Sequence, residues 1–197
     1  MGKEFEAKVL LTSEEYIDIL EKEILNEPSV KKSDIYYSKY SSTEAALKNG
    51  ESLTRIRTEG DKAYLTLKKK ELVNGFENNK ECETKIENIE VVKKLLLEAG
   101  YSPYFKKYKT SHTMYIRLPT VLIPGVEVHI ELEKVENSIH TEKSTYKRFY
   151  ALEIEAITSA GFDTHTEELA EIVKTYFNYF NKTEKDFETR SWRELLG

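Results

Sequence analysis

Charged and apolar side chains alternate along several stretches of the chain, and the first of these runs from Glu4 to Lys8. Successive side chains of an extended chain point to opposite faces. Glu4, Glu6 and Lys8 would therefore share one face of a strand, and Phe5 and Ala7 the other. The pattern predicts a strand here, but it leaves open whether the charged face meets water or lines a site.

The same alternation recurs along the chain and predicts about eight strands with mostly local connections. Glu59-Gly60-Asp61 is expected to turn the chain between two of them, and Asn74-Gly75 is interpreted as a linker that precedes another. The expected strands cover residues 3–11, 30–40, 53–57, 63–68, 81–85, 104–117, 126–135 and 149–157.

Apolar residues at helical spacing predict helices between these strands. Thr12 and Glu15 form a capping-box pattern, and Gly100 is expected to end a helix that begins at Asn88. A short helical turn is expected over residues 43–48. The other expected N-caps with their box partners are Thr164 with Glu167 and Ser191 with Glu194. Many strands and few helices favour an α+β fold, an antiparallel sheet or barrel with helices packed outside.

Composition narrows the classes of function. A chain of 197 residues with 39% hydrophobic and 33% charged residues is expected to be one soluble domain. It has neither an apolar run of membrane-spanning length nor a signal-peptide pattern. The single cysteine, Cys82, cannot form an internal disulfide, so a cytoplasmic location is expected. The net charge of −5 argues against a protein that coats nucleic acid, although a local basic cluster could still bind a polyanion.

The charges on the strands come as neighbours of the same sign two residues apart, such as Arg55 with Arg57 and Glu153 with Glu155. Like charges at this spacing repel unless opposite charge lies between them. The residues on the charged faces include Glu4, Glu6, Lys8, Arg55, Arg57, Lys68, Glu81, Glu83, Lys107, Lys109, Glu127, His129, Glu131, Glu133, Glu153 and Glu155. Residues on the opposite faces, including Ile56, Leu65 and Leu67, are expected to pack in a core.

Two arrangements fit these faces. An ordinary sheet would turn its charged face to water. A closed barrel would instead place apolar residues outside, under the helices, and the charges in an interior just wide enough for side chains or one small ligand. Buried charges must be paired, hydrated or bound to ions and ligand. Arginine and lysine suit phosphate oxygens and carboxylates suit Mg²⁺ or Mn²⁺, so the barrel predicts a polyphosphate with a divalent metal.

Glu4-x-Glu6-x-Lys8 resembles the ExExK signature of the CYTH superfamily, the triphosphate tunnel metalloenzymes. Lys109 stands where that family has arginine, and residues 120–140 lack its usual Leu-Asp pair, so Glu131 and Glu133 are both candidates for the acidic position there. Further motifs resemble the family in the same order along the whole chain. They are Arg55-Ile56-Arg57, Leu65-Thr66-Leu67-Lys68, Glu81-Cys82-Glu83, Lys107-x-Lys109, Glu153-Ile154-Glu155 and the tail Ser191-Trp192-Arg193-Glu194-Leu195-Leu196.

The resemblance implies one CYTH-like domain over residues 1–197, folded as an eight-stranded antiparallel closed barrel that binds a triphosphate in its tunnel. It implies metal-dependent hydrolysis of inorganic tripolyphosphate or an organic triphosphate by in-line attack of water. Glu6 and Lys8 are the expected catalytic residues. The expected substrate-binding residues are Lys8, Arg55, Arg57, Lys68, Glu81, Glu83, Lys107 and Lys109. The expected ligands of Mg²⁺ or Mn²⁺ are Glu4, Glu6, Glu131, Glu133, Glu153 and Glu155.

Two other functions stay open. One is a class IV adenylate cyclase, which makes cyclic AMP and pyrophosphate from ATP, and the other is a non-catalytic polyphosphate-binding module. The cyclases carry a histidine-phenylalanine stretch before the tyrosine of the second strand, and Lys32-Ser33-Asp34-Ile35-Tyr36 lacks it, which favours the hydrolase. The expected partner is a triphosphate-containing small molecule, with no nucleic-acid coating and no membrane, and a homodimer is left open. Trp192, Tyr36 and Tyr37 are expected to pack rather than to stack on a base, and His129 to line the tunnel or lie at the surface.

Overall fold

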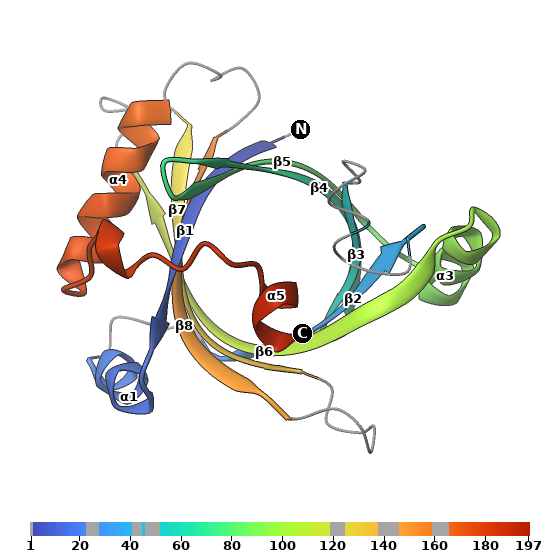
Figure 1. The fold of residues 1–197 in the computed structure, drawn as a ribbon, viewed down its shortest axis with the longest axis horizontal. Coiled ribbons are helices and arrows are strands. Elements are labelled where there is room, and N and C mark those ends of the chain that lie inside the picture. The colour runs from blue at the N-terminus through green and yellow to red at the C-terminus, as the bar shows by residue number, and fades with distance from the viewer. Residues whose placement is uncertain are drawn as a thin grey trace.

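The computed structural model describes residues 2–22, 28–40, 45, 52–118, 125–137, 146–158 and 166–197. Its centre is a closed antiparallel barrel with the strand order β1-β5-β4-β3-β2-β6-β7-β8 (Figure 1). This confirms the predicted fold class, an α+β protein built on an eight-stranded barrel. The strands are β1 (Gly2–Leu11), β2 (Val30–Ser38), β3 (Leu53–Glu59), β4 (Lys62–Val73), β5 (Phe76–Lys85), β6 (Ser102–Arg117), β7 (Val126–Asn137) and β8 (Arg148–Thr158).

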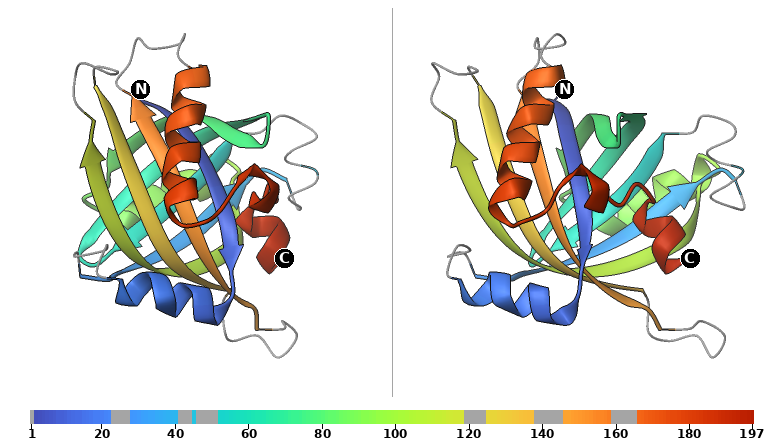
Figure 2. Two further views of the ribbon diagram at one scale, coloured as in Figure 1. Left: turned by 90° about the vertical axis from the view of Figure 1, so that its left-hand side faces the viewer. Right: turned by 60° about the vertical axis from the view of Figure 1, so that its left-hand side comes forward.

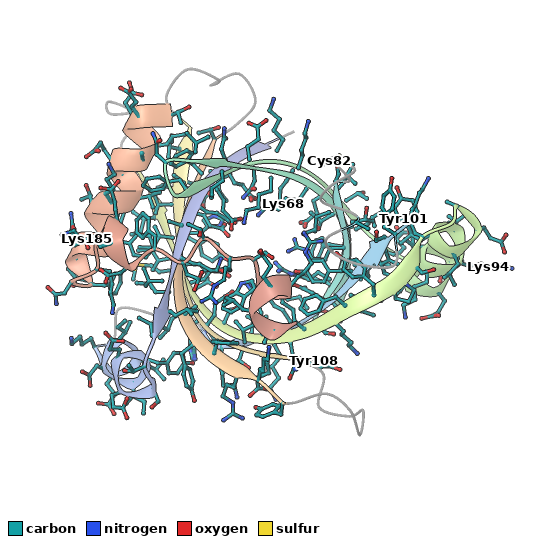
Figure 3. All side chains as sticks on the ribbon, in the orientation of Figure 1. Lys68, Cys82, Lys94, Tyr101, Tyr108 and Lys185 are labelled. Atoms are coloured by element: carbon teal, nitrogen blue, oxygen red, sulfur yellow. The ribbon has the colours of Figure 1, made fainter. Side chains whose placement is uncertain are left out.

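The strand β1 closes the barrel because it pairs on both sides. Glu6 lies opposite Glu155 of β8 on one side and Glu77 of β5 on the other. Closure gives every strand one inward and one outward face, so the period-two alternation separates the two classes of side chain. Side chains such as Lys68 point into the ring of strands, and Lys94 and Lys185 lie outside it (Figure 3).

Apart from α5, the described helices lie outside the barrel, and two of the predicted capping boxes are present. Thr12 caps α1 (Ser13–Glu21) with Glu15, and Ser191 caps α5 (Trp192–Leu196) with Glu194. Asn88 accepts a hydrogen bond at the start of α3 (Ile89–Glu98), as predicted. The remaining helical elements are α4 (Thr166–Tyr179) and the short 3-10 helix η1 (Glu184–Asp186). The expected cap Thr164 lies outside the described residues, and so does the expected turn over 43–48 apart from Ala45.

Helices cover the outward apolar side of the barrel, as the charged-lumen arrangement requires. α4 lies along β1 and β8, where Leu169, Val173 and Phe177 join Phe5 and other outward residues in one buried cluster (Figure 2). A second cluster beneath α3 contains Tyr37, Ile56 and Ala63. Removing such side chains from water is the main favourable term in folding.

One predicted core residue is exposed. Leu67 was grouped with the core on the outward face of β4, but 47% of its surface is accessible. The cluster under α3 includes Leu65, two residues earlier on the same face, and ends before Leu67. The period-two alternation therefore placed Leu67 on the correct, outward face of β4. It could not show that α3 does not extend over this position.

The predicted linker at Asn74-Gly75 is a tight turn instead. Asn74 has a φ of 52° and Gly75 a φ of 86°, and two successive positive φ values are typical of a two-residue hairpin turn of type I′. β4 and β5 therefore continue to Val73 and from Phe76, well beyond the predicted 63–68 and 81–85. The extension adds Glu77 and Asn79 to the inward face of β5.

A third apolar cluster lies on the inward side at one end of the barrel. Val135 and Ala151 pack there with Trp192, Leu195 and Leu196 of α5. The C-terminal helix therefore packs into the ring of strands (Figure 1). Among the described helices, none has the length and apolar character needed to span a membrane.

Candidate functional site

The inward faces of the strands enclose a cavity of about 860 Å³, to which every strand and α5 contribute. Most of the residues predicted for the site line it. These are Glu4, Glu6, Arg55, Arg57, Lys68, Glu81, Glu83, Lys107, Lys109, Glu131, Glu153 and Glu155. The other two, Lys8 and Glu133, are buried in the surrounding wall. The structure therefore brings residues from the whole length of the sequence into one charged chamber.

Basic residues on one wall surround a single buried carboxylate, that of Asp34. Arg57 donates to it from Nε at 2.8 Å and from Nη2 at 3.0 Å. Lys107 Nζ lies 3.7 Å and Arg55 Nη1 3.9 Å from Asp34 Oδ2. Burial alone would raise the pKa of Asp34, but Arg57 and Arg55 outweigh it and hold that pKa well below its usual range. Asp34 is therefore ionised and orients the cations around it.

Lys107 differs from the arginines beside it. The difference is the direction of the pKa shift. Burial together with the neighbouring charge of Lys109 lowers the pKa of Lys107 well below the usual lysine range, whereas the pKa values of Arg55 and Arg57 are raised. An anion that enters this wall would therefore stabilise the charged form of Lys107.

On a second wall, Lys68 lies among three carboxylates. Its Nζ is 3.3 Å from Glu4 Oε2, 3.2 Å from Glu6 Oε1 and 3.0 Å from Glu81 Oε1. Burial raises the pKa of Glu4 to about 7. Burial acts in the same direction on Glu6, but the charge of Lys68 prevails and lowers the pKa of Glu6. Lys68 thus screens carboxylates that would otherwise repel one another.

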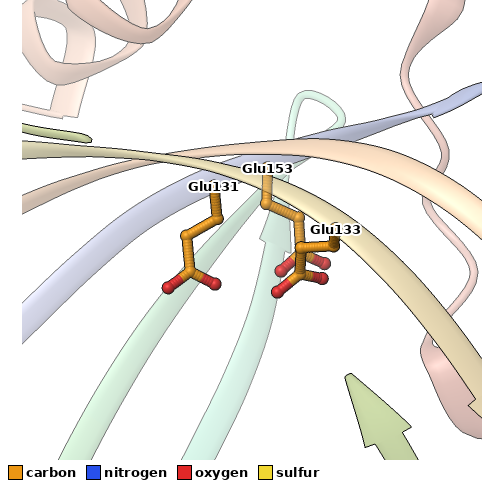
Figure 4. Close-up of side chains that lie close together, drawn as sticks. All are labelled: Glu131, Glu133 and Glu153. Carbon is orange, nitrogen blue, oxygen red and sulfur yellow. The ribbon is translucent and has the colours of Figure 1, made fainter. Parts of the chain in front are cut away.

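A third group joins Glu131, Glu133 and Glu153, whose carboxylates come together in Figure 4. One ligand oxygen from each lies within 4.8 Å of the others. Lys109 donates hydrogen bonds to Glu133 and, at 3.0 Å, to Glu153 Oε2, and it lies 4.0 Å from Glu131 Oε2. The sequence left either Glu131 or Glu133 as the acidic residue of β7, and both belong to this group.

The group around Glu133 fits a hard divalent cation. Among the described residues, Glu133 Oε2 is a buried oxygen with no hydrogen-bond partner. Burial and the charge of Glu153 raise the pKa of Glu133 well above its usual range. Such an environment favours either a proton or a cation, and carboxylate oxygens are the ligands that Mg²⁺ and Mn²⁺ prefer.

The remaining predicted residues occupy less central positions. Lys8 Nζ lies 3.7 Å from Glu77 Oε1. Glu83 accepts a hydrogen bond from Thr66 Oγ1 at 2.7 Å, and 40% of its side chain is accessible. Glu155 lines the cavity beside His129, whose Nδ1 is 3.8 Å away.

The aromatic residues of the sequence have mixed locations. Tyr37 packs in the cluster beneath α3. Tyr36 is buried and lines the cavity, and its hydroxyl donates to Asp34 Oδ2 at 3.4 Å. Trp192 packs in the apolar cluster at the end of the barrel and lines the cavity as well.

The polar residues of the chamber that were not assigned from the sequence include four that pair with predicted site residues. Lys32 donates to Glu131 Oε1 at 2.8 Å, and Asn79 donates to Glu6 Oε1 at 3.0 Å. Asp34 and Glu77 are the other two. Lys32 and Asp34 alternate with Tyr36 at period two, which was a usable signal, whereas Glu77 and Asn79 were hidden by the interpretation of the preceding turn as a linker.

Comparisons with known proteins support the fold. The sequence model of the CYTH domain matches residues 2–191. Solved structures with the same fold include PH1012 from Pyrococcus horikoshii OT3, which is 21% identical with a TM-score of 0.68 over 98% of this chain and 99% of that one. A candidate adenylate cyclase from Bacillus halodurans is 14% identical with a TM-score of 0.62, covering 99% of this chain and 98% of that one.

A more distant structure is HpAC1 from Hippeastrum, a candidate adenylyl cyclase described as having a dominant triphosphatase activity. It is 13% identical with a TM-score of 0.54, covering 100% of this chain and 95% of that one. A search of curated proteins found no match to the chain. At these identities the solved structures show a shared fold.

Proposed function

The chain belongs to the CYTH family, whose members act as triphosphatases or adenylate cyclases, and we propose that it hydrolyses a linear triphosphate. The observation that carries this proposal is the separation of charge inside one cavity. Arginines and lysines gather around Asp34, and carboxylates gather on the walls formed by β1, β7 and β8. A polyphosphate with a divalent cation requires both kinds of group at close range.

The cationic wall is proposed to bind the phosphate chain. Arg55 and Arg57 offer forked N–H donors that match phosphate oxygens, and Lys107 adds a point charge. Asp34 keeps Arg57 in a fixed orientation before substrate arrives, so less side-chain freedom is lost on binding. Lys68, Lys109, Glu81 and Glu83 complete the proposed binding set, the two glutamates by holding Lys68 and Arg55 in place.

The carboxylate walls are proposed to hold Mg²⁺ or Mn²⁺. Glu131, Glu133 and Glu153 form the best-fitting set, and Glu4, Glu6 and Glu155 form a second acidic group in the same chamber. A bound divalent cation would neutralise phosphate oxygens and polarise the phosphorus. The metal-binding family to which the chain belongs supports this assignment.

In the proposed reaction, an oxygen–phosphorus bond forms between water and the terminal phosphorus while the phosphoanhydride bond opposite it breaks. The proton lost by water passes to a carboxylate of the chamber, and the products are orthophosphate and a diphosphate. Glu6 is proposed to orient the attacking water, since its carboxylate stays ionised between Lys68 and Asn79. Lys8, buried beside Glu77, is proposed to stabilise the charge that develops at the reacting phosphate.

A substrate panel tests the proposal. Purified protein is incubated with tripolyphosphate, ATP, GTP or thiamine triphosphate and Mg²⁺ or Mn²⁺, and orthophosphate, pyrophosphate and cyclic AMP are measured. Orthophosphate from at least one compound is the expected result. Cyclic AMP with pyrophosphate from ATP would replace the hydrolase by the cyclase, and no product from any compound would favour a binding module.

A further inference from the structure

Trp192 is the single tryptophan of the sequence, and it lies inside the charged chamber. Its Nε1 donates a hydrogen bond to Glu153 Oε1 at 2.7 Å, and only 8% of the residue is accessible. The other oxygen of Glu153 accepts a hydrogen bond from Lys109 at 3.0 Å. With a separate donor on each oxygen, the carboxylate plane of Glu153 has a defined orientation.

The indole ring also borders the basic residues of the chamber. Lys107 Nζ lies 5.5 Å and Lys8 Nζ 5.7 Å from the ring centroid. Both distances are within the range in which an ammonium group is attracted to an aromatic face. One side chain therefore contacts a carboxylate of the acidic group and two lysines proposed to face the phosphates.

The position of Trp192 is set by contacts on either side of it along the chain. Before it, the backbone N–H of Glu188 donates to the carbonyl of Lys8 at 2.8 Å, and Phe187 forms a bridge with Val9. After it, Leu195 and Leu196 are buried in the apolar cluster with Val135 and Ala151. The indole is therefore held by the tail and does not depend on Glu153 for its placement.

We propose that Trp192 is a positioning residue that fixes Glu153 for metal binding and thereby makes the metal site depend on the C-terminal segment 187–196. The inference rests on the proposed function only in taking Glu153 as a metal ligand. A side chain that orients a metal ligand commonly changes metal affinity by about 10- to 100-fold when it is removed. Trp192 has no contact with substrate in this role and acts through Glu153.

The test compares Trp192→Phe with Phe149→Leu in calorimetric titrations with Mn²⁺ alone. Phe149 packs against Trp192, with ring centroids 6.3 Å apart, so its truncation disturbs the same cluster but leaves the indole N–H in place. We expect Trp192→Phe to weaken Mn²⁺ binding by about tenfold or more and Phe149→Leu to leave it within about twofold. Equal losses in both variants, or wild-type affinity in Trp192→Phe, would overturn the proposal.

A double-mutant cycle separates positioning from general damage. In a Glu153→Gln background, Trp192→Phe should cause no further loss of Mn²⁺ affinity, because the ligand that it positions is already changed. Additive losses would contradict the assignment. If Trp192→Phe does not fold, Glu153→Ala provides the alternative, since loss of the indole's acceptor should shift the emission of Trp192 in metal-free protein.

Fluorescence of the wild-type protein gives a readout that is independent of turnover. Mg²⁺ should change the emission of Trp192 with the same half-saturation that calorimetry gives. A protein that binds Mg²⁺ and reports it through Trp192 but hydrolyses no triphosphate would disprove the proposed function and keep this inference. A protein in which neither Mg²⁺ nor Mn²⁺ binds would overturn the inference itself.

Discussion

Asp34 accepts two parallel hydrogen bonds from Arg57, at 2.8 Å and 3.0 Å, in a part of the barrel where almost no surface of Asp34 is accessible. A buried carboxylate in this geometry is a fixed internal counter-ion for the arginine. Its removal leaves Arg57, Arg55 and Lys107 without their shared partner. The relationship would make both the stability of the fold and the proposed substrate binding depend on Asp34.

The substitution Asp34→Asn should lower the free energy of unfolding by about 3–5 kcal/mol at pH 7, since an uncompensated buried charge remains. The folded-state pKa of Asp34 lies below its ordinary value of 3.8, so its contribution is present above that pH and is lost as pH falls through the folded pKa. Urea unfolding at pH 7 and pH 3 should therefore show a smaller deficit of the variant at pH 3, where the unfolded chain already binds a proton at this residue and the folded protein does not. A deficit that is the same at both values would contradict the role of the charge.

Tripolyphosphate should partly replace the missing carboxylate of Asp34→Asn. An added anion can pair with the cations that the substitution leaves uncompensated, so the rise in Tm with tripolyphosphate should be larger in the variant than in wild type. Differential scanning fluorimetry with and without tripolyphosphate measures this difference. Smaller protection of the variant would show that the orientation Asp34 gives Arg57 contributes more to anion binding than the cations released by the substitution.

The substitution Glu6→Gln should separate turnover from binding. It removes the charge that Lys68 and Asn79 hold in place while it keeps the size of the side chain. We expect kcat to fall by about 100-fold or more, with tripolyphosphate still raising Tm. Glu90→Gln on the exposed face of α3 is the matched control, and it should leave both quantities unchanged. Unaltered turnover in Glu6→Gln would remove Glu6 from the catalytic set.

Lys109→Met should make the thermal stability of the protein more dependent on a bound divalent metal. Lys109 is the cation between Glu133 and Glu153, so its loss leaves these buried carboxylates to repel one another. We expect a lower Tm in EDTA and a larger increase in Tm on adding Mg²⁺ than in wild type. Lys106→Met is the control, since Lys106 lies on the same strand with its ammonium 4.8 Å from the ring centroid of Tyr108. A metal-induced shift no larger than that of wild type would indicate that Mg²⁺ binds elsewhere.

Gly75→Ala should destabilise the fold with little effect on catalysis. The nearest side-chain atom to an added Cβ would be 3.9 Å away, so space is not limiting, but the φ of 86° strains any residue with a side chain. We expect a loss of about 1 kcal/mol or more in urea unfolding and an unchanged KM. Asn74→Gly, at the other positive φ of the turn, should not destabilise the turn through φ strain, and a larger loss there would point to a role for the Asn74 side chain.

The barrel and most of its lining could be predicted from the sequence because both depend on a local rule. In Glu4–Lys8 and in Glu131–Glu133, side chains two residues apart share a face regardless of what surrounds the strand. The excess of charge on one face and of apolar residues on the other then favours a closed barrel with a charged interior. Both the charged and the apolar faces can be read from the amino-acid sequence without knowing which strands pair.

The partners within the chamber could not be predicted in the same way. The carboxylate partners of Lys109, for example, could not be identified, because strand register decides which inward residues meet. Asp34 lies between lysine and tyrosine positions, where a single acidic residue did not continue any same-sign pattern. Glu77 lies on the inward face because β5 begins directly after the turn at Asn74-Gly75. Interpreting that turn as a linker left residues 76–80 out of the predicted strand.

The position of β1 between β5 and β8 also has a consequence for biosynthesis. β1 is synthesised before both strands that pair with it, and one of its edges has no partner until β8 has been made. Lys8 lies opposite Glu153 only after that event. Contacts of such large sequence separation make folding slow, and an unpaired strand edge invites association with other chains. We therefore expect the open edge of β1 to need protection until β8 is made, so co-expressed chaperones that shield unpaired strand edges should raise the yield of folded protein.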